Sequence, residues 1–192
     1  MNRIFCLETE WVQTIHDLKR KSTVLSLLEL VNSTFGESIQ FVFRQVASLS
    51  DFNYYLDHLM APSYDAYDTI YLCFHGTEGE IHFADKLSDQ PSYRLLELAT
   101  DYQGVFKGRN IIFGSCWTLK AKEEDLVLFK KTTGARIVIG YSKSVKSDDS
   151  FIFEYWLLCA LAKHPDYGAK RLLALAEEEM PYLVKKLGLI CY

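Results

Sequence analysis

The sequence is poor in the residues that mark several specialised classes of protein. It has only four prolines and ten glycines, and its five cysteines are widely spaced without a Cys-x-x-Cys pair. This usage argues against a disulfide framework and against a structural zinc site, and it predicts reduced thiols in the cytoplasm. No Gly-, Ser- or Pro-rich linker and no internal repeat divides the 192 residues, so we expect one domain over residues 1–192.

An excess of positive charge and long apolar runs are also missing. The formal net charge is −4, whereas a nucleic-acid binder usually carries a basic stripe. No run approaches the ~18 apolar residues of a membrane span, and Glu8 follows the first apolar residues too soon for a signal peptide. We therefore expect neither nucleic acid nor membrane as a partner. The hydrophobic content of 49% and aromatic content of 14% indicate a packed core instead.

Short apolar runs alternate with amphipathic stretches along the chain. Apolar, β-branched or aromatic runs predict strands at residues 3–7, 39–46, 69–74, 80–83, 110–113 and 135–140. Helical spacing of apolar residues predicts helices at residues 22–35, 93–102, 122–132, 148–163 and 167–187. A further helix is predicted to begin after an N-cap at residues 50–51. Strands that are apolar throughout are covered on both faces by helices. The pattern thus predicts an α/β fold of three layers, α/β/α, with a mainly parallel central sheet.

Two of the buried strands end in residues that can do chemistry. His75 and Gly76 follow the strand at 69–74, and Cys116 follows the strand at 110–113 by way of Gly114. Ligand sites in parallel sheets lie beyond the carboxyl ends of the strands, so a thiol and an imidazole would meet there as nucleophile and proton-transfer partner. Gly76 and Cys116 would supply backbone N–H groups to an oxyanion hole. We also expect Cys116 to open a loop-to-helix connection, where a helix N-terminus favours the reactive thiolate.

The segments 70–76 (Ile-Tyr-Leu-Cys-Phe-His-Gly) and 110–116 (Asn-Ile-Ile-Phe-Gly-Ser-Cys) resemble the two signature blocks of the caspase-like cysteine peptidases, which include caspases, separases and gingipains. The nearest likeness is to bacterial CHAT domains, because residues 136–149 correspond to their apolar strand, the short turn after it and the acidic residues that open the next helix. The likeness spans residues 69–160. It implies a caspase-like fold and a cysteine endopeptidase with Cys116 and His75 as the catalytic dyad. It also implies a protein or peptide substrate and no metal or organic cofactor. Because a free cytosolic protease needs restraint, we further expect a regulatory protein partner, a ligand or a proteolytic event to control it.

Two adjacent carboxylates fall in the segment that would flank the cleft. Asp148 and Asp149 could bind a Lys or Arg side chain of a substrate by ion pairing, which would direct cleavage to basic residues. Ser147-Asp148-Asp149 is equally a good cap and first turn for the helix that follows. Both interpretations stay open on the sequence alone.

Two other functions remain alternatives to a peptidase. The chain could be a caspase-like binding or signalling module that has the fold without turnover, because a fold does not fix a function. It could also be an esterase that uses Cys116, but the sequence around Cys116 lacks the second glycine of a nucleophile elbow. Only His164 follows Cys116 in the chain, where that fold places its histidine.

Overall fold

The computed structural model describes residues 3–9, 22–85 and 89–192. Its centre is a six-stranded sheet with the strand order β2-β1-β3-β7-β8-β9. The strands are β1 (Arg3–Thr9), β2 (Gln40–Val46), β3 (Thr69–Cys73), β7 (Asn110–Phe113), β8 (Ile137–Tyr141) and β9 (Leu189–Cys191). The first five are parallel, and only β9 runs antiparallel to its neighbour β8. This architecture confirms the predicted α/β class with a mainly parallel sheet.

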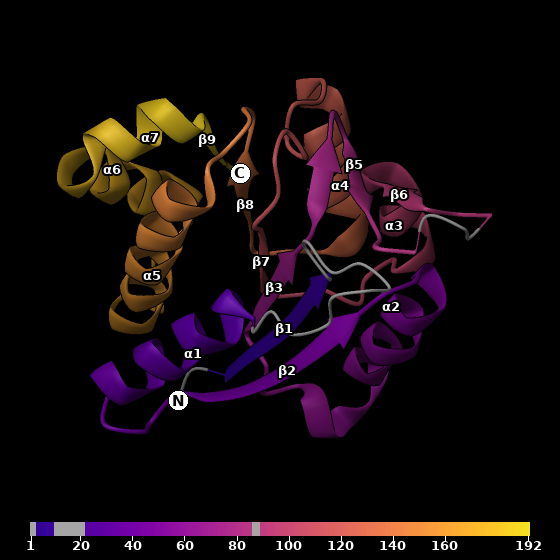
Figure 1. The fold of residues 1–192 in the computed structure, drawn as a ribbon, viewed down its shortest axis with the longest axis horizontal. Helices are drawn as coiled ribbons and strands as arrows, with labels where there is room; N and C mark the ends of the chain where they lie inside the picture. The colour runs from indigo at the N-terminus through magenta and orange to yellow at the C-terminus, as the bar shows by residue number, and fades with distance from the viewer. Residues whose placement is uncertain (1–2, 10–21, 86–88) are drawn as a thin grey trace, which may run out of the picture.

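Helices cover both faces of the sheet (Figure 1). One face is covered by α1 (Thr23–Thr34), α5 (Ser147–Lys163), α6 (Ala169–Glu179) and α7 (Pro181–Leu187). The other is covered by α2 (Leu49–Leu56), α3 (Leu95–Asp101) and α4 (Glu123–Thr133), with two short 3₁₀ turns, Asp57–Met60 and Pro62–Tyr64, after α2. No helix in the described part of the chain is both long enough and apolar enough to cross a bilayer.

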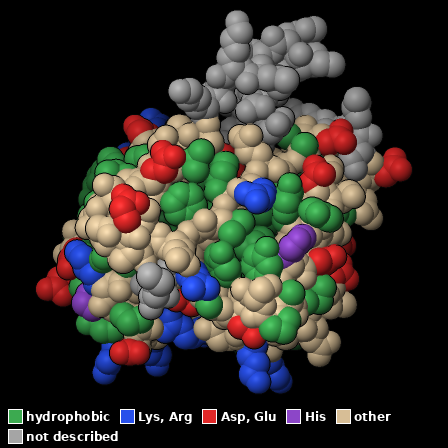
Figure 2. Space-filling view, turned by 90° about the horizontal axis from the view of Figure 1, so that it is seen from below, with side chains coloured by type: hydrophobic (Ala, Val, Ile, Leu, Met, Phe, Trp, Pro, Cys, Tyr) green, Lys and Arg blue, Asp and Glu red, His purple; other side chains and the backbone are tan. Residues whose placement is uncertain are grey.

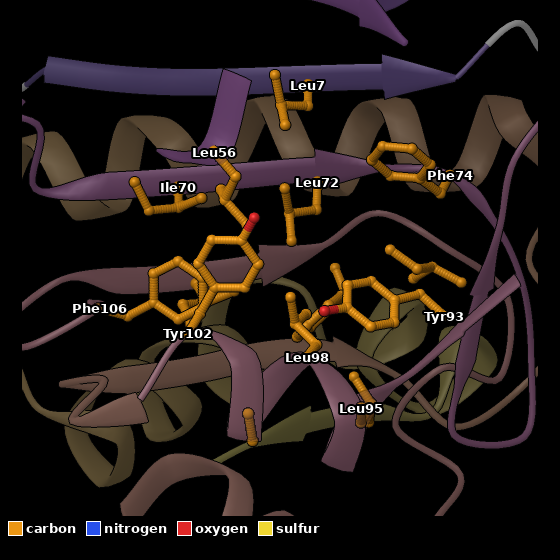
Figure 3. Packing of buried hydrophobic residues seen from close by; sticks show 14 of the residues in the cluster. Leu7, Leu56, Ile70, Leu72, Phe74, Tyr93, Leu95, Leu98, Tyr102 and Phe106 are labelled. Carbon is orange, nitrogen blue, oxygen red and sulfur yellow. The ribbon is translucent and has the colours of Figure 1, made fainter. Parts of the chain in front are cut away.

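The central strands are apolar throughout because each of their faces meets a helical layer. On β3, Ile70 and Leu72 pack into the core under α2, α3 and α4, whereas Tyr71 and Cys73 face the core under α1 and α5. Figure 3 shows Ile70 and Leu72 against side chains of the α3 region, such as Leu98 and Tyr102. Successive side chains of a strand point to opposite faces, so a strand between two layers needs apolar residues at every position.

The edge strand β2 differs from these central strands. Its middle residues Phe41, Val42 and Phe43 are only half-buried, whereas all five residues of β3 are buried. β2 is the lowest strand of Figure 1, and the view from below in Figure 2 shows hydrophobic side chains interspersed with charged ones on this side. The site discussed below lies instead at the carboxyl ends of the buried central strands.

A small antiparallel sheet follows β3 directly. It consists of β4 (His75–Thr77), β5 (Glu80–His82) and β6 (Ser92–Arg94). The strand predicted at residues 80–83 is therefore present as β5. The helix predicted from residue 93 begins only at Leu95, because Ser92–Arg94 pair with β5.

Two predicted helices also differ from the structure. Ser48, not Ser50, caps α2, since its hydroxyl accepts a hydrogen bond from the Asp51 amide. The single helix predicted over residues 167–187 is two helices, with the break at Met180 before Pro181, because proline has no N–H for an interior helix position. The chain then adds β9, which the sequence analysis missed.

Candidate active site

His75 and Cys116 follow adjacent parallel strands at matching positions. In the register of β3 and β7, Leu72 lies opposite Phe113, and each site residue comes three positions later along its strand. Parallel neighbours are about 4.8 Å apart, so both residues leave the sheet at the same edge. His75 begins β4 and is exposed, while Cys116 lies in a turn after β7 and is partly exposed. The pairing of β3 with β7 thus brings the two residues to one edge of the sheet.

Gly76 packs directly against the Cys116 turn. A Cβ atom added at this glycine would lie 2.5 Å from the carbonyl oxygen of Cys116 and would collide with the Thr118 hydroxyl. Real Cβ contacts of this length do not occur, so the close approach of the two backbones requires glycine here. The His-Gly block and the Cys116 block are therefore in contact at the backbone level.

A buried hydrogen-bond cluster fixes the turn that carries Cys116. The Ser115 and Thr118 hydroxyls are both buried and lie 2.5 Å apart. Thr118 also donates to the carbonyl oxygen of Glu80 at 3.3 Å, which joins the turn to β5. Trp117 has a φ of 53°, a left-handed conformation that is strained for a bulky side chain.

Cys116 opens the connection that leads to α4, as expected, but α4 does not begin beside the thiol. The chain makes a turn over residues 115–119, and α4 begins only at Glu123. The Trp117 amide bonds instead to the Lys143 carbonyl at 3.0 Å, and the Leu119 amide bonds to that of Tyr141 at 3.1 Å. These bonds turn the chain back across the end of β8 before a helix can form.

The Cys116 thiol contacts the loop that follows β8. Its Sγ accepts a hydrogen bond from the Val145 amide at 3.3 Å and lies 3.7 Å from the Val145 carbonyl oxygen. The Ser144 hydroxyl is 4.0 Å away. A backbone N–H directed at sulfur stabilises negative charge that develops there. The loop over residues 142–146 is therefore part of the surroundings of Cys116.

The other four cysteines are poorly suited to be nucleophiles. Burial raises the thiol pKa of Cys6, Cys73 and Cys159, and it raises the pKa of Cys191 to about 12. The thiolate is the reactive form, so these thiols stay protonated and unreactive at neutral pH. Within the described residues, no group of three or more His, Cys, Asp or Glu side chains is placed to hold a metal ion.

The hairpin that begins with His75 brings further polar residues to this edge. β4 and β5 pair His75 with His82, and Thr77 bonds to His82 Nε2 at 2.8 Å. Glu78, three residues after His75, forms an ion pair with Lys120, four residues after Cys116. This pair borders a cavity of about 580 Å³ whose lining includes Leu95, Leu96 and Ala121. The two blocks thus continue side by side beyond His75 and Cys116.

Asp148 and Asp149 lie in the first turn of α5, three and four residues beyond Val145. Asp148 is exposed. Asp149 forms an ion pair with Lys186 of α7, with an N···O distance of 2.7 Å. The negative charges of both carboxylates also interact favourably with the helix dipole at the N-terminus of α5. The structure therefore places both near the thiol-contacting loop, with Asp149 already bonded within the chain.

Sequence reasoning missed the residues that shape the turn. Ser115 lies within the block at 110–116 and Thr118 follows it by two residues, and their spacing of three residues is common in turns, so local sequence carried a weak signal for them. Val145 acts through its backbone amide, which no side-chain pattern reveals. Its contribution depends on how β8 and its loop pack beside β7.

Together, the sheet order and the two helical layers give this chain a caspase-like α/β fold. Solved structures agree: 131 chains match, among them caspase-1 from Spodoptera frugiperda, with a TM-score of 0.54 and 14% sequence identity. That match covers 91% of this chain and 73% of the caspase chain. At this identity the likeness shows the fold alone.

A family model matches residues 1–166, so the chain belongs to the family described as "Family of unknown function (DUF6642)". The search of curated proteins found no match.

Proposed function

We propose that this chain is a cysteine endopeptidase in which Cys116 is the nucleophile and His75 is the acid–base. The observation that carries this proposal is that the two residues follow the adjacent strands β3 and β7 at equivalent positions of the register. The backbone of Gly76 packs against the Cys116 carbonyl group. A nucleophile and its proton-transfer partner need such a shared edge. Partial exposure of Cys116 gives a substrate access to the sulfur.

The reaction follows from the groups at this edge. The Cys116 thiolate attacks the carbonyl carbon of the scissile peptide bond, and the Gly76 and Cys116 N–H groups stabilise the resulting oxyanion. His75 donates a proton to the leaving amine, the C–N bond breaks, and a thioester remains on Cys116. His75 then accepts a proton from water, which attacks the thioester and releases the carboxylic acid product.

The surroundings favour an extended peptide as substrate. The 142–146 loop lies on one side of Cys116 and the β4–β5 hairpin lies on the other. Asp148, exposed at the start of α5, would attract a Lys or Arg side chain of a peptide bound between them. We therefore propose cleavage after basic residues, with Asp148 contributing more than Asp149.

A labelling and cleavage experiment with matched controls tests the dyad. The wild type and the variants Cys116→Ala and His75→Gln are incubated with a peptide library and, separately, with iodoacetamide at neutral pH. Cys191→Ala controls for the other partly exposed thiol, and His82→Gln controls for the histidine opposite His75. We expect Cys116→Ala to abolish cleavage and labelling, and His75→Gln to reduce cleavage about 1,000-fold or more.

The control variants should stay within about threefold of wild type. A wild-type protein that cleaves no peptide and whose Cys116 does not react with iodoacetamide would overturn the proposal. That result would favour a caspase-like binding module instead.

A further inference from the structure

A buried carboxylate lies directly behind the nucleophile turn. Glu154, in the middle of α5, is only 7% exposed, and its side chain points into the sheet. Its Oε2 accepts a hydrogen bond from the Tyr71 hydroxyl at 2.6 Å, and its Oε1 accepts one from the Tyr141 hydroxyl at 3.0 Å. Nothing in the peptidase mechanism above uses this group.

The carboxylate joins the three strands that carry the site. Tyr71 is on β3, four residues before His75. Tyr141 ends β8 and leads into the loop whose Val145 amide contacts the Cys116 thiol. Between them, β7 leads to Gly114, where an added Cβ atom would lie only 3.1 Å from Glu154 Oε1 and 3.1 Å from the Tyr71 ring. Glu154 thus packs against the backbone two residues before Cys116.

No positive charge offsets this carboxylate among its described neighbours. The titratable side chains that face it are Tyr71 and Cys73 of β3, Tyr141 of β8 and Cys6 of β1. Burial raises the pKa of all four, so they are neutral around pH 7. The ionic contacts of α5 with other helices lie elsewhere, as at Asp149 with Lys186.

Burial therefore determines when Glu154 is charged. It raises the pKa of Glu154 to about 7, against the smaller opposing effect of the two tyrosine hydrogen bonds. The ionised carboxylate accepts both hydroxyl protons at once. A protonated carboxyl group carries its own O–H, so its two oxygens can no longer accept from both tyrosines equally. The hydrogen bonds behind the nucleophile turn must then rearrange.

We propose that Glu154 is a positioning residue for Cys116: its carboxylate holds the ends of β3, β7 and β8 in the reactive arrangement and releases them when it takes up a proton. The effect on turnover rests on the proposed peptidase function, but the effect on the 142–146 loop does not. Glu154 acts through Tyr71, Tyr141 and Gly114, because it does not itself touch the thiol.

The first experiment measures the loop without activity. In protein carrying Cys116→Ala and His75→Gln, neither site residue titrates, and the ¹⁵N–¹H resonance of Val145 is followed from pH 5.5 to 8.5. We expect a titration with a midpoint near 7 that disappears when Glu154→Gln is added. A resonance that does not respond to pH, or that responds equally in the Glu154→Gln protein, would overturn the proposal.

Tyrosine variants give a second, directional result. Tyr141→Phe and Tyr71→Phe each remove a hydrogen bond that favours the ionised carboxylate, so the Val145 midpoint should move to higher pH in both. A midpoint that stays fixed, or moves to lower pH, would contradict the assignment to Glu154. These variants retain the ring packing, which keeps the test valid should Glu154→Gln fold poorly.

The third experiment uses peptide hydrolysis. The wild-type kcat should fall about tenfold per pH unit below 7 as Glu154 takes up a proton. The kcat of Glu154→Gln should lack this pH dependence, and its KM should change little. Wild type without turnover at any pH would refute the peptidase function, and the Val145 titration would then decide the positioning role alone. A pH profile of Glu154→Gln identical to that of wild type would refute the positioning role.

Discussion

Two polar clusters flank the end of β7, and they are built in opposite ways. The Cys116 turn is partly open to solvent, and the thiol has backbone groups as its hydrogen-bond partners. The Glu154 cluster is closed, and its partners are side chains from two strands. Only Ser115 separates Gly114, the glycine that touches Glu154, from Cys116.

This difference separates the tasks of the two clusters. In the proposed peptidase the substrate must reach the Cys116 thiol, and backbone partners hold this residue while leaving its side chain accessible. A carboxylate that only organises strand ends is better held in a water-free core, where hydrogen bonds are stronger and each unpaired group is costly. The closed cluster therefore has the larger effect on stability, and the open one has the larger effect on chemistry.

The largest stability effect is expected from the charge of Glu154. Its pKa is raised from 4.5 to about 7 on folding, so the folded state binds a proton that the unfolded chain has released between these values. The free energy of unfolding should therefore fall as pH rises from about 4.5 to 7, by about 3 kcal/mol in total.

Urea unfolding of wild type and Glu154→Gln across pH 4–8 measures this effect. The glutamine variant lacks this contribution, so the difference between the two proteins should shrink or reverse as pH rises. A difference that is constant with pH would mean that Glu154 is not a buried titrating group, and the contrast between the two clusters would disappear.

A smaller effect is expected at the contact between the His75 and Cys116 blocks. Gly76→Ala forces a methyl group against the Cys116 carbonyl and should destabilise the protein by about 2 kcal/mol. Because the displacement falls on the nucleophile turn, peptide hydrolysis should drop by about 100-fold.

Gly79→Ala is the matched control for this glycine. Gly79 belongs to the same hairpin and has a φ of 74°, but nothing lies within 4 Å of its added Cβ. It should cost about 1 kcal/mol from backbone strain alone, with activity close to wild type. Equal losses of activity in both variants would show that the hairpin conformation, and not its contact with Cys116, is what matters.

The sheet and the positions of His75 and Cys116 at its edge were predictable for a common physical reason. Strands such as Thr69–Cys73 and Asn110–Phe113 are buried on both faces, so their apolar runs are continuous and their ends are marked by polar residues and glycine. Glu154 was not predictable in this way. It sits in a helix where a glutamate normally faces solvent, and only the tertiary positions of Tyr71 and Tyr141 make it a buried acceptor.

The failed predictions share the opposite cause. The Cys116 turn depends on hydrogen bonds to residues that are distant in the sequence. The break before Pro181 is a helix boundary that the periodic spacing of apolar residues does not show. The Trp117 amide, for example, bonds to Lys143, twenty-six residues later. No local pattern around Cys116 reports that partner.

The smallest effect distinguishes the two acidic residues at the start of α5. Asp148 is exposed, whereas Asp149 is held by Lys186. If Asp148 binds the basic side chain of a substrate, Asp148→Asn should lower kcat/KM about tenfold for peptides with Arg or Lys before the scissile bond. Peptides with Gln there should be unaffected, and Asp149→Asn should change either value less than about threefold. Equal losses for charged and uncharged peptides in the Asp148 variant would mean that its carboxylate acts only on the N-terminus of α5, because a helix-capping role does not distinguish substrates.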